Sequence, residues 1–316
     1  MLNAMNWFRA SRKEPGWLAI SFDESRLSYV HGRYVPAGKS SIARFGTAKF
    51  EPKPHAAGKL AKDLHFERYQ CTTLLRPGEY QMLLLEAPAV PAAELKSAIR
   101  WRIKDMLDYH VDDATMDVLD IPPESELPGR SHSMYAVAAR NEVIRGRIKA
   151  FEEAQIPLGV IDIPETAQRN ISALHETEGR GAALLYFNQE FGLLTITCRS
   201  ELYLSRRIDI GLGQLLGAAA GAHEQLFGRV VLELQRSFDH FERQFQHVPI
   251  AKLLLGPEPE ETGLLAHLKG NMDIAVERVD LVERLGFNGQ GAPGPALQWQ
   301  LFHLIGASLR HEAKVL

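Results

Sequence analysis

Strand-like segments begin both halves of the chain, and this repetition restricts the choice of fold more than any other feature. In the first half, residues 17–22 and 26–31 predict two strands joined by a tight turn. In the second half, residues 182–187, 192–198 and 202–208 predict a three-stranded meander. Helices and further strands follow in each half. We therefore predict an α/β protein built from two similar halves.

The segment that follows residue 88 predicts a helix with one unusual side chain. Pro91 suits a first helical turn, and Glu94 places a negative charge near the positive end of the helix dipole. The apolar stripe of this helix consists of Leu95, Ala98, Ile99, Ile103, Met106 and Leu107. Trp101 projects from the opposite, charged face, and packing under a neighbouring element is favoured over a contact with a partner. The candidate partner-binding residues on this face are Trp101, Lys104, Asp105 and Asp108.

A small α+β unit is expected between the two halves. Residues 88–163 predict helix, strand, strand, helix and strand in that order, with Asn141 capping the second helix. Residues 70–75 and 80–85 predict a strand pair, whereas 36–54 predicts a loop with one short strand. Further expected elements are helices at 58–69, 262–268 and 297–311, a strand at 251–255, and a long helix with Val231, Leu234, Phe238, Phe241 and Phe245 as core positions.

The composition is that of a soluble globular protein. Hydrophobic residues make up 45% of the 316 residues, the net charge is −3, and no long basic run supports nucleic-acid binding. Cys71 and Cys198 are expected to be reduced core residues. No apolar run is long enough to span a membrane and residues 1–10 do not resemble a signal peptide, so we expect a cytoplasmic protein. Residues 1–16 fit a frayed terminus better than a membrane-touching amphipathic segment.

Six motifs, in this order, resemble those of the type IV pilus assembly protein PilM family. They are AP-x-VP-x-x-EL-x-x-AI-x-W-x-IKD at 87–105, VDDATMDVLDIP at 111–122, YAVAARNEVI at 135–144, DIPETAQRN at 162–170, LELQRSFDHFE at 232–242 and GASLR at 306–310. The motifs are most similar to those of the MSHA-pilus branch, the MshI proteins. The resemblance covers nearly the whole chain and implies an actin-like, duplicated ribonuclease H-like fold. It also implies the inserted α+β subdomain that PilM shares with FtsA.

The resemblance further implies a domain organisation and a partner. Residues 1–87 and 158–180 would form the first domain, 88–157 the inserted subdomain, 181–296 the second domain, and 297–316 a C-terminal helix that packs back on the first domain. The implied partner is the N-terminal cytoplasmic peptide of a bitopic inner-membrane protein, PilN-like or MshJ-like. The chain would then lie in the cytoplasm, peripheral to the inner membrane, among the proteins of the pilus assembly platform. A homo-oligomer is a further alternative.

The residues at the implied nucleotide site depart from the pattern of the fold. Actin-like folds hold Mg-ATP with two hairpins that each carry an Asp and a Gly, and with a later glycine turn for adenosine. Here Ser21 stands at the first Asp position, with Asp23 and Glu24 behind it, and Tyr186 and Asn188 stand at the second hairpin. The adenosine turn keeps only Gly256. We therefore expect no hydrolysis, no tight nucleotide binding and no cofactor; the alternative is a shifted register in which Asp23 binds the metal.

Other candidate constellations are weaker. The glycines of Gly211-x-Gly213-x-x-x-Gly217 lack the Lys-Ser/Thr of a phosphate loop and are typical of a turn that begins a helix. His110 with Asp112 and Asp113 could ligate a metal, but this cluster more simply ends a solvated helix. His223, His240 and His247 do not share one helical face. No local Ser-His-Asp or Cys-His arrangement is present.

Three functions remain to be compared. The favoured one is a non-catalytic scaffold that binds a peptide of a membrane partner between the core and the inserted subdomain. The alternative is an ATP-dependent assembly factor, or ATPase, of the same fold. A small-molecule kinase of the superfamily is the third, but the sequence singles out no carboxylate as its catalytic base.

Overall fold

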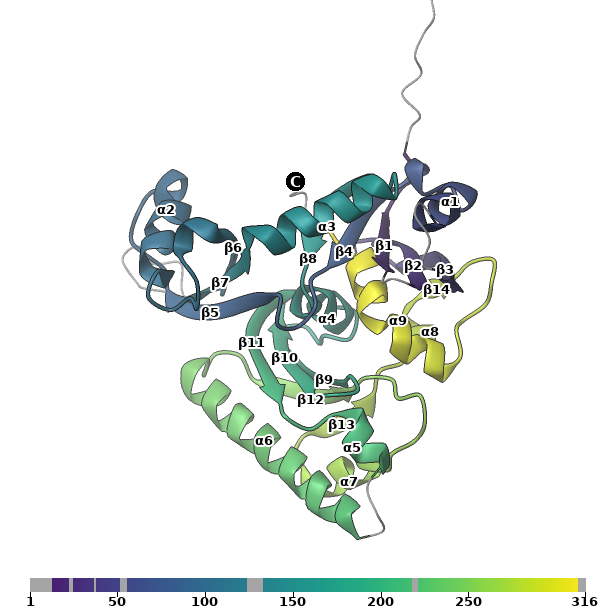
Figure 1. The fold of residues 1–316 in the computed structure, drawn as a ribbon. Helices are drawn as coiled ribbons and strands as arrows, with labels where there is room; N and C mark the ends of the chain where they lie inside the picture. Colours follow the sequence, from purple (N-terminus) through teal and green to yellow (C-terminus); the bar gives the residue numbers. More distant parts are fainter. Residues whose placement is uncertain are drawn as a thin grey trace, which may run out of the picture.

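The computed structural model describes residues 13–22, 25–36, 38–51, 56–123, 133–217 and 221–311. Its elements form two halves with a small unit beside them (Figure 1). The first half contains β1 (Trp17–Phe22), β2 (Arg26–Arg33), β3 (Ser41–Lys49), α1 (Ala56–Asp63), β4 (Gln70–Leu74), β8 (Leu158–Asp162) and α4 (Pro164–Ser172). The second half contains β9 (Gly181–Phe187), β10 (Gly192–Cys198), β11 (Glu201–Ile208), α5 (Leu212–Gly217), α6 (Ala222–Gln244), β12 (Ile250–Leu255), α7 (Leu264–Asn271) and β13 (Ala275–Arg278).

The two large sheets share one topology. The first has the strand order β14-β3-β2-β1-β4-β8, where β14 is Gly286–Phe287, and the second has the order β11-β10-β9-β12-β13. In both, an antiparallel meander of three strands is extended by two parallel strands. The series β3-β2-β1-β4-β8 is thus repeated as β11-β10-β9-β12-β13. This repetition confirms the predicted duplicated α/β fold.

Two helices form a layer between the large sheets, and each packs on the sheet of the other half. Helix α4 follows the last strand of the first sheet but contacts β9, β10 and β11 of the second. Helix α9 (Pro295–Ser308), at the end of the second half, contacts β1, β2 and β4 of the first sheet. The two helices also pack against each other (Figure 1). This exchange of helices buries apolar surface of both halves in one shared core.

The contact between α4 and α9 depends on a glycine. A Cβ atom on Gly306 would lie 2.0 Å from the carbonyl oxygen of Ala167, so only glycine fits where the two backbones meet. The Asn170 amide donates a hydrogen bond to the Gly306 carbonyl over 3.0 Å. Arg310 and Asp162 form an ion pair at 2.6 Å, and both side chains are largely buried. A close crossing with buried polar contacts therefore joins the halves.

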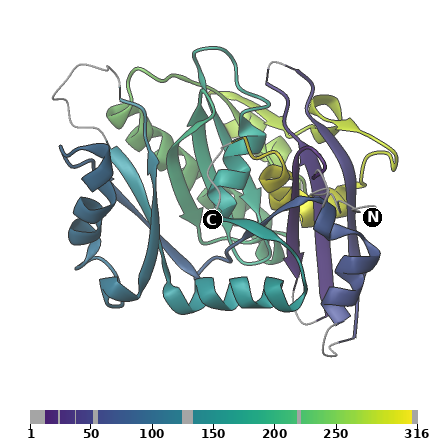
Figure 2. The same ribbon diagram turned by 90° about the horizontal axis from the view of Figure 1, so that it is seen from above.

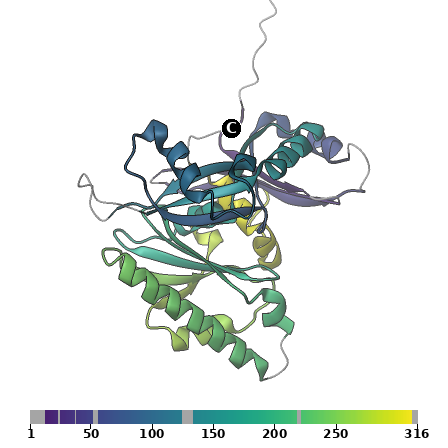
Figure 3. The same cartoon turned by 60° about the vertical axis from the view of Figure 1, so that its left-hand side comes forward.

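The outer face of the second sheet is covered by α6 (Figure 3). Its predicted core positions Val231, Leu234, Phe238, Phe241 and Phe245 are all buried, which confirms the helical periodicity. The strands β9 and β10 are buried along their whole length because helices cover both faces of the sheet.

The small unit consists of a three-stranded sheet and two helices. Its sheet has the order β5-β7-β6, and α2 packs on one face through Ile99 and Ile103. Helix α3 runs from this unit to the first sheet, where Phe151 joins the core (Figure 2). The elements are β5 (Tyr80–Glu86), α2 (Ala92–Ile103), β6 (Ala114–Asp120), β7 (Ser133–Arg140) and α3 (Asn141–Glu153).

Three sequence-based expectations about this part of the chain are wrong. The strands β4 and β5 do not pair: β4 lies between β1 and β8, whereas β5 pairs with β7 in the small sheet. A turn between two apolar segments does not by itself make a hairpin, and here the chain leaves one sheet for another at this turn. Met106 was expected on the buried apolar stripe of the helix at 88–107. Because α2 already ends at Ile103, the Met106 side chain lies beyond the helix and is 48% exposed. Asn141 does not cap α3; its side chain bonds Thr115 and the Asp112 carbonyl instead.

Smaller differences concern the ends of elements. The 36–54 segment, expected to be mainly loop, contains the nine-residue strand β3, which pairs with β2 along its length. The expected helix at 58–69 is divided into α1 and a short 3-10 turn at Phe66–Arg68.

Cys71 and Cys198 are free and buried, as expected. None of the described helices is both long and apolar enough to cross a membrane.

We expect the Gly306→Ala variant to be destabilised by roughly 1–3 kcal/mol, because the new methyl group would force α4 and α9 apart. Urea unfolding of the full chain measures this loss. The matched control is Gly146→Ala in α3, where a Cβ would meet no atom within 4 Å. The control should be neutral or gain about 0.5–1 kcal/mol of helix propensity. Equal stability of the two variants would show that the helix crossing is not tight.

Candidate functional site

A cavity of about 260 Å³ lies where the two halves and the small unit meet. The turn between β4 and β5, the first turn of α4, the hairpin of β9 and β10, and α9 all line it. The side chains and glycines that border the cavity are Pro77, Gly78, Tyr80, Met82, Pro164, Glu165, Tyr186, Asn188, Phe191, Leu193, Ser205, Arg207 and His303. Cavities at such junctions are the usual place for a ligand in folds of two halves.

Burial shifts the pKa values of two ionisable groups of this cavity in the direction that favours their neutral forms. Burial raises the pKa of Glu165, whose carboxylate accepts a 2.6 Å hydrogen bond from the Tyr80 hydroxyl. Burial lowers the pKa of His303 to about 4, and its Nε2 lies 3.3 Å from the Gln168 side-chain oxygen. Within the described part of the chain, the Ser205 hydroxyl is not hydrogen-bonded to Glu165 or to His303, so no nucleophile is paired with a base here.

The structure brings together two positions of the expected nucleotide site, Tyr186 and Gly256. The Tyr186 hydroxyl donates a 2.9 Å hydrogen bond to the Trp299 carbonyl, and its ring stacks on Phe302 with centroids 4.7 Å apart. A Cβ atom on Gly256 would lie 3.0 Å from the Tyr186 ring. The ring of Tyr186 therefore packs directly against the glycine turn that would accept adenosine.

Asn188, at the same hairpin, is used within the turn. Its side-chain oxygen accepts hydrogen bonds from the backbone N–H groups of Glu190 and Phe191, both at 2.8 Å. The indole N–H of Trp299 binds the adjoining Phe187 carbonyl at 2.8 Å, which ties α9 to the hairpin. The side-chain oxygen of Asn188 and the indole N–H of Trp299 therefore already have partners inside the protein.

These groups do not fit magnesium and a triphosphate. A metal ion at this hairpin would need carboxylate oxygens, and the phosphates would need free backbone donors. Tyr186 offers a phenol that is already bonded, and the N–H groups of the turn already bond Asn188. In the first hairpin, Ser21 is half-buried and pairs with Ser28 across the strands. Asp23 and Glu24 lie outside the described residues, so the register with Asp23 as metal ligand stays a prediction.

The structure places Trp101 at the surface, contrary to the expectation that a neighbouring element would bury it. The side chain is 75% exposed, because α2 lies at the periphery with only its inner face on the small sheet (Figure 1). The Lys104 ammonium is 5.7 Å from the centre of the indole ring. Asp105 and Asp108 are also exposed, and Asp108 lies 3.5 Å from the Arg140 guanidinium. The face that the sequence singled out is thus open to solvent.

The other sequence candidates have local structural roles. His110 accepts a hydrogen bond from the Asp112 backbone N–H and begins a short 3-10 turn. Within the described ranges, no group of three His, Cys, Asp or Glu side chains is placed to hold a metal ion. Gly211 directly precedes α5, as expected of a turn before a helix.

Sequence reasoning missed the residues that build the cavity wall from α4 and α9. Gln168 is buried and donates to the Leu184 and Leu193 carbonyls and the Thr195 hydroxyl, which fixes α4 on the second sheet. Glu165 lies within the DIPETAQRN motif and His303 lies just before the GASLR motif, but neither was named as a site residue. The DIPETAQRN motif contained a usable signal, since Pro164 at the first helical position predicts a helix there.

Comparison with known proteins relates the architecture to a solved complex. No family model matches the sequence, and no curated protein does. A chain of a "PilM-PilN type IV pilus biogenesis complex" has the same fold with a TM-score of 0.68 and 18% identity, over 95% of this chain and 100% of that one. Together with the repeated strand order, this similarity decides the fold. The chain has an actin-like fold.

Two further structures are less similar to this chain. The cytoplasmic domain of EpsL from the type II secretion system of Vibrio cholerae has a TM-score of 0.46 and 12% identity, over 91% of this chain and 93% of that one. A protein of unknown function with an actin-like ATPase fold from Bacteroides thetaiotaomicron has a TM-score of 0.45 and 10% identity, over 94% and 99%.

We expect the stability of the protein to fall as the pH drops from 6.5 to 4, and His303 to cause part of this fall. Burial lowers the pKa of His303 from 6.5 to about 4, so in this window the unfolded chain binds a proton that the folded chain does not. His303→Gln should therefore reduce the pH dependence of the unfolding free energy, on the order of 2 kcal/mol across the window. The pKa of His175 is also lowered to about 4, so His175 should still contribute a similar pH dependence of the unfolding free energy in this variant.

Urea unfolding at a series of pH values measures the slope, independently of any loss of stability that the substitution causes at pH 7. A variant slope equal to that of the unchanged protein would mean that His303 takes up a proton in the folded state.

Proposed function

We propose that this chain is a cytoplasmic, non-catalytic scaffold of a type IV pilus assembly platform, of the MSHA type. In this proposal it binds the N-terminal cytoplasmic peptide of a bitopic inner-membrane protein, PilN-like or MshJ-like, and is peripheral to the membrane through that partner. The observation that carries the proposal is the actin-like fold shared with the PilM-PilN complex over 95% of the chain. The six PilM-like motifs support it independently.

The domain organisation that we propose differs from the sequence-based one at a single boundary. The expected inserted subdomain was 88–157, but β5 belongs to the small sheet. We therefore begin the inserted unit at Tyr80 and keep 158–180 with the first domain, 181–296 as the second domain, and 297–316 as the C-terminal segment.

Exposed apolar side chains support the inserted unit as the place of peptide binding. Among the described residues, four of the seven exposed large hydrophobic side chains belong to it or to its connections: Leu84, Val90, Trp101 and Met106. Such residues are unusual on a free surface and typical of an interface. In addition, β5 is an edge strand of the small sheet, so an extended peptide has a strand to pair with. In this proposal Trp101 is the main anchor, and Lys104, Asp105 and Asp108 form its polar rim.

The packing of the cleft supports a function without catalysis. Tyr186 lies against Gly256, and Asn188 closes the hairpin that would otherwise surround the phosphates. A nucleotide would have to displace the contacts of Tyr186 with Phe302 and Trp299, which join the two halves. We therefore propose that the cleft has become part of the core and that partner binding takes place elsewhere.

For the partner, we expect Trp101→Ala to weaken peptide binding about thirtyfold, because a central aromatic anchor contributes roughly 2 kcal/mol. The measurement is fluorescence anisotropy with labelled N-terminal peptides of the PilN-like or MshJ-like membrane proteins. Val282→Ala is the matched control, since Val282 is an apolar side chain, 48% exposed, on α8 (Leu281–Arg284). Unchanged affinity in Trp101→Ala, with binding by the unchanged protein, would remove Trp101 from the interface.

For the cleft, we expect Mg-ATP at millimolar concentration to leave the melting temperature unchanged. A ligand at about 100 times its dissociation constant would stabilise the folded state by about 2.7 kcal/mol, enough to raise the melting temperature by several degrees. Magnesium chloride without nucleotide is the control. A saturable rise with Mg-ATP would contradict the proposal and favour an ATP-dependent assembly factor.

A further inference from the structure

A second surface with the features of a binding groove lies on the other half of the molecule. It is a hollow of about 440 Å³ between the end of the edge strand β11 and the middle of α6. Four arginines border it, Arg206 and Arg207 from the strand and Arg229 and Arg236 from the helix. We name this surface the arginine groove.

The arginine groove carries excess positive charge. Glu233 pairs with Arg206 and with Arg236, both at 3.1 Å, and Asp209 pairs with Arg207 at 2.8 Å. Arg207 lies over the Phe191 ring at the central cavity and is neutralised by Asp209, because adjacent side chains of a strand point to opposite faces. Three arginines, Arg206, Arg229 and Arg236, then share the one carboxylate of Glu233, which leaves two positive charges beside α6. Arg229 has no ion pair with another described residue and is exposed. This concentration contrasts with the net charge of −3 of the whole chain.

The backbone of β11 is open beside these arginines. This strand pairs with β10 on one side only, and on the other side the Tyr135 hydroxyl of the small unit binds the Ser205 N–H and the Tyr203 carbonyl. Because backbone groups alternate along an antiparallel strand, the N–H and C=O of Arg207 point to the same outer side as the Ser205 N–H. Beyond the two residues that Tyr135 binds, the edge of β11 at Arg207 therefore offers a backbone N–H and a backbone C=O to another extended segment.

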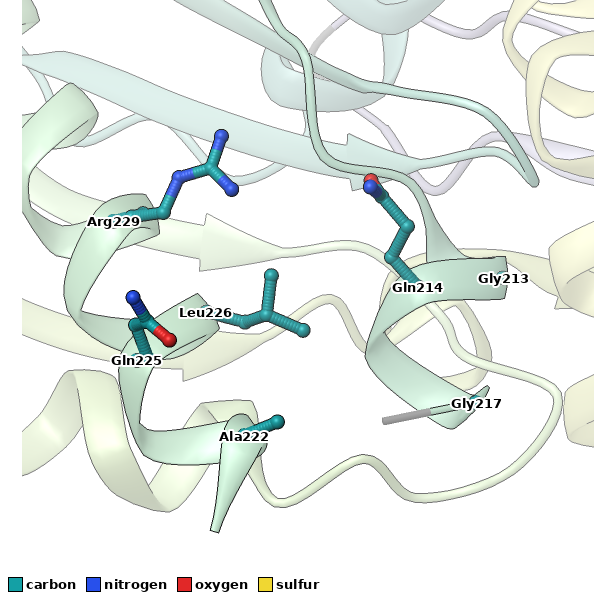
Figure 4. A pocket seen from close by; sticks show the side chains of 7 residues that line it. All are labelled: Gly213, Gln214, Gly217, Ala222, Gln225, Leu226 and Arg229. Atoms are coloured by element: carbon teal, nitrogen blue, oxygen red, sulfur yellow. The ribbon is translucent and has the colours of Figure 1, made fainter. Parts of the chain in front are cut away.

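An apolar contact and a second hollow extend the arginine groove. Leu232, between Arg229 and Arg236 on the helix, is 45% exposed and borders the groove. A neighbouring hollow of about 390 Å³ between α5 and α6 shares Arg229 with it. Figure 4 shows Leu226 pointing from α6 toward α5 across this second hollow. The two hollows together follow α6 along one side.

We propose that the arginine groove binds an extended, acidic segment of a partner protein. Its carboxylates would bind the arginines in pairs of charge-assisted hydrogen bonds, and its backbone would pair with the open edge of β11. An apolar side chain of the segment would lie on Leu232. The strand edge and the leucine favour a peptide over a nucleic acid or a lipid headgroup, which would use the charges alone. The surface belongs to α6 and β11, so this inference does not depend on peptide binding at Trp101.

The test uses the full chain and a labelled peptide of alternating glutamate and valine as the probe, with a lysine and valine peptide for comparison. We expect the acidic peptide to bind more weakly as salt rises, and Arg229→Glu combined with Arg236→Glu to lower its affinity at least about tenfold. Both arginines are exposed, so the melting temperature of this double variant should stay close to that of the unchanged chain.

The matched control is Lys59→Glu combined with Lys269→Glu, which makes the same change in net charge at two exposed lysines outside the groove. The milder pair Arg229→Gln and Arg236→Gln should give an intermediate loss of affinity. Equal losses in the groove and control variants would overturn the proposal, as would no binding of the acidic peptide. Arginine-dependent sedimentation with phosphatidylglycerol vesicles, without peptide binding, would assign the groove to a membrane surface and overturn it as well.

Discussion

The crossing of α4 and α9 is the contact on which the rest of the structure depends. Each helix packs on the sheet of the opposite half, and the two backbones meet where Gly306 faces Ala167. The buried Gln168 bonds across to the second sheet, and the Arg310–Asp162 pair closes the end of the crossing. Because apolar surface from both halves is buried in this layer, neither half has a complete core without the other.

The same two helices also determine what the cleft can do. Helix α9 supplies Trp299, Phe302 and His303, which hold the Tyr186 ring against the turn at Gly256. In our proposal, side-chain packing between the halves has replaced ligand-mediated closure. Surfaces on the outside of the molecule then become the places where partners bind, one on the inserted unit and one along β11 and α6.

Much of the fold could be predicted from the sequence because its periodicities are local. The meander of the second half follows from three apolar segments separated by short turns, and the phenylalanine stripe of α6 follows from three- and four-residue spacing. Which strands pair is decided over longer distances, and this is why β5 was assigned to β4. The exposure of Trp101 could not be deduced, because it depends on whether another element covers α2. The arginine groove was missed for the same reason, since β11 and α6 supply its charges from separate segments.

Hydrogen–deuterium exchange on the full chain tests the central claim most directly, because one experiment observes the inserted unit and the cleft together. With the N-terminal peptide of the membrane partner, we predict slower exchange in α2 and β5 and no change in the hairpin of β9 and β10. With Mg-ATP at millimolar concentration, we predict no change in that hairpin or at Gly256. Protection of the hairpin and of Gly256 by Mg-ATP, with α2 and β5 unaffected by the peptide, would contradict the account.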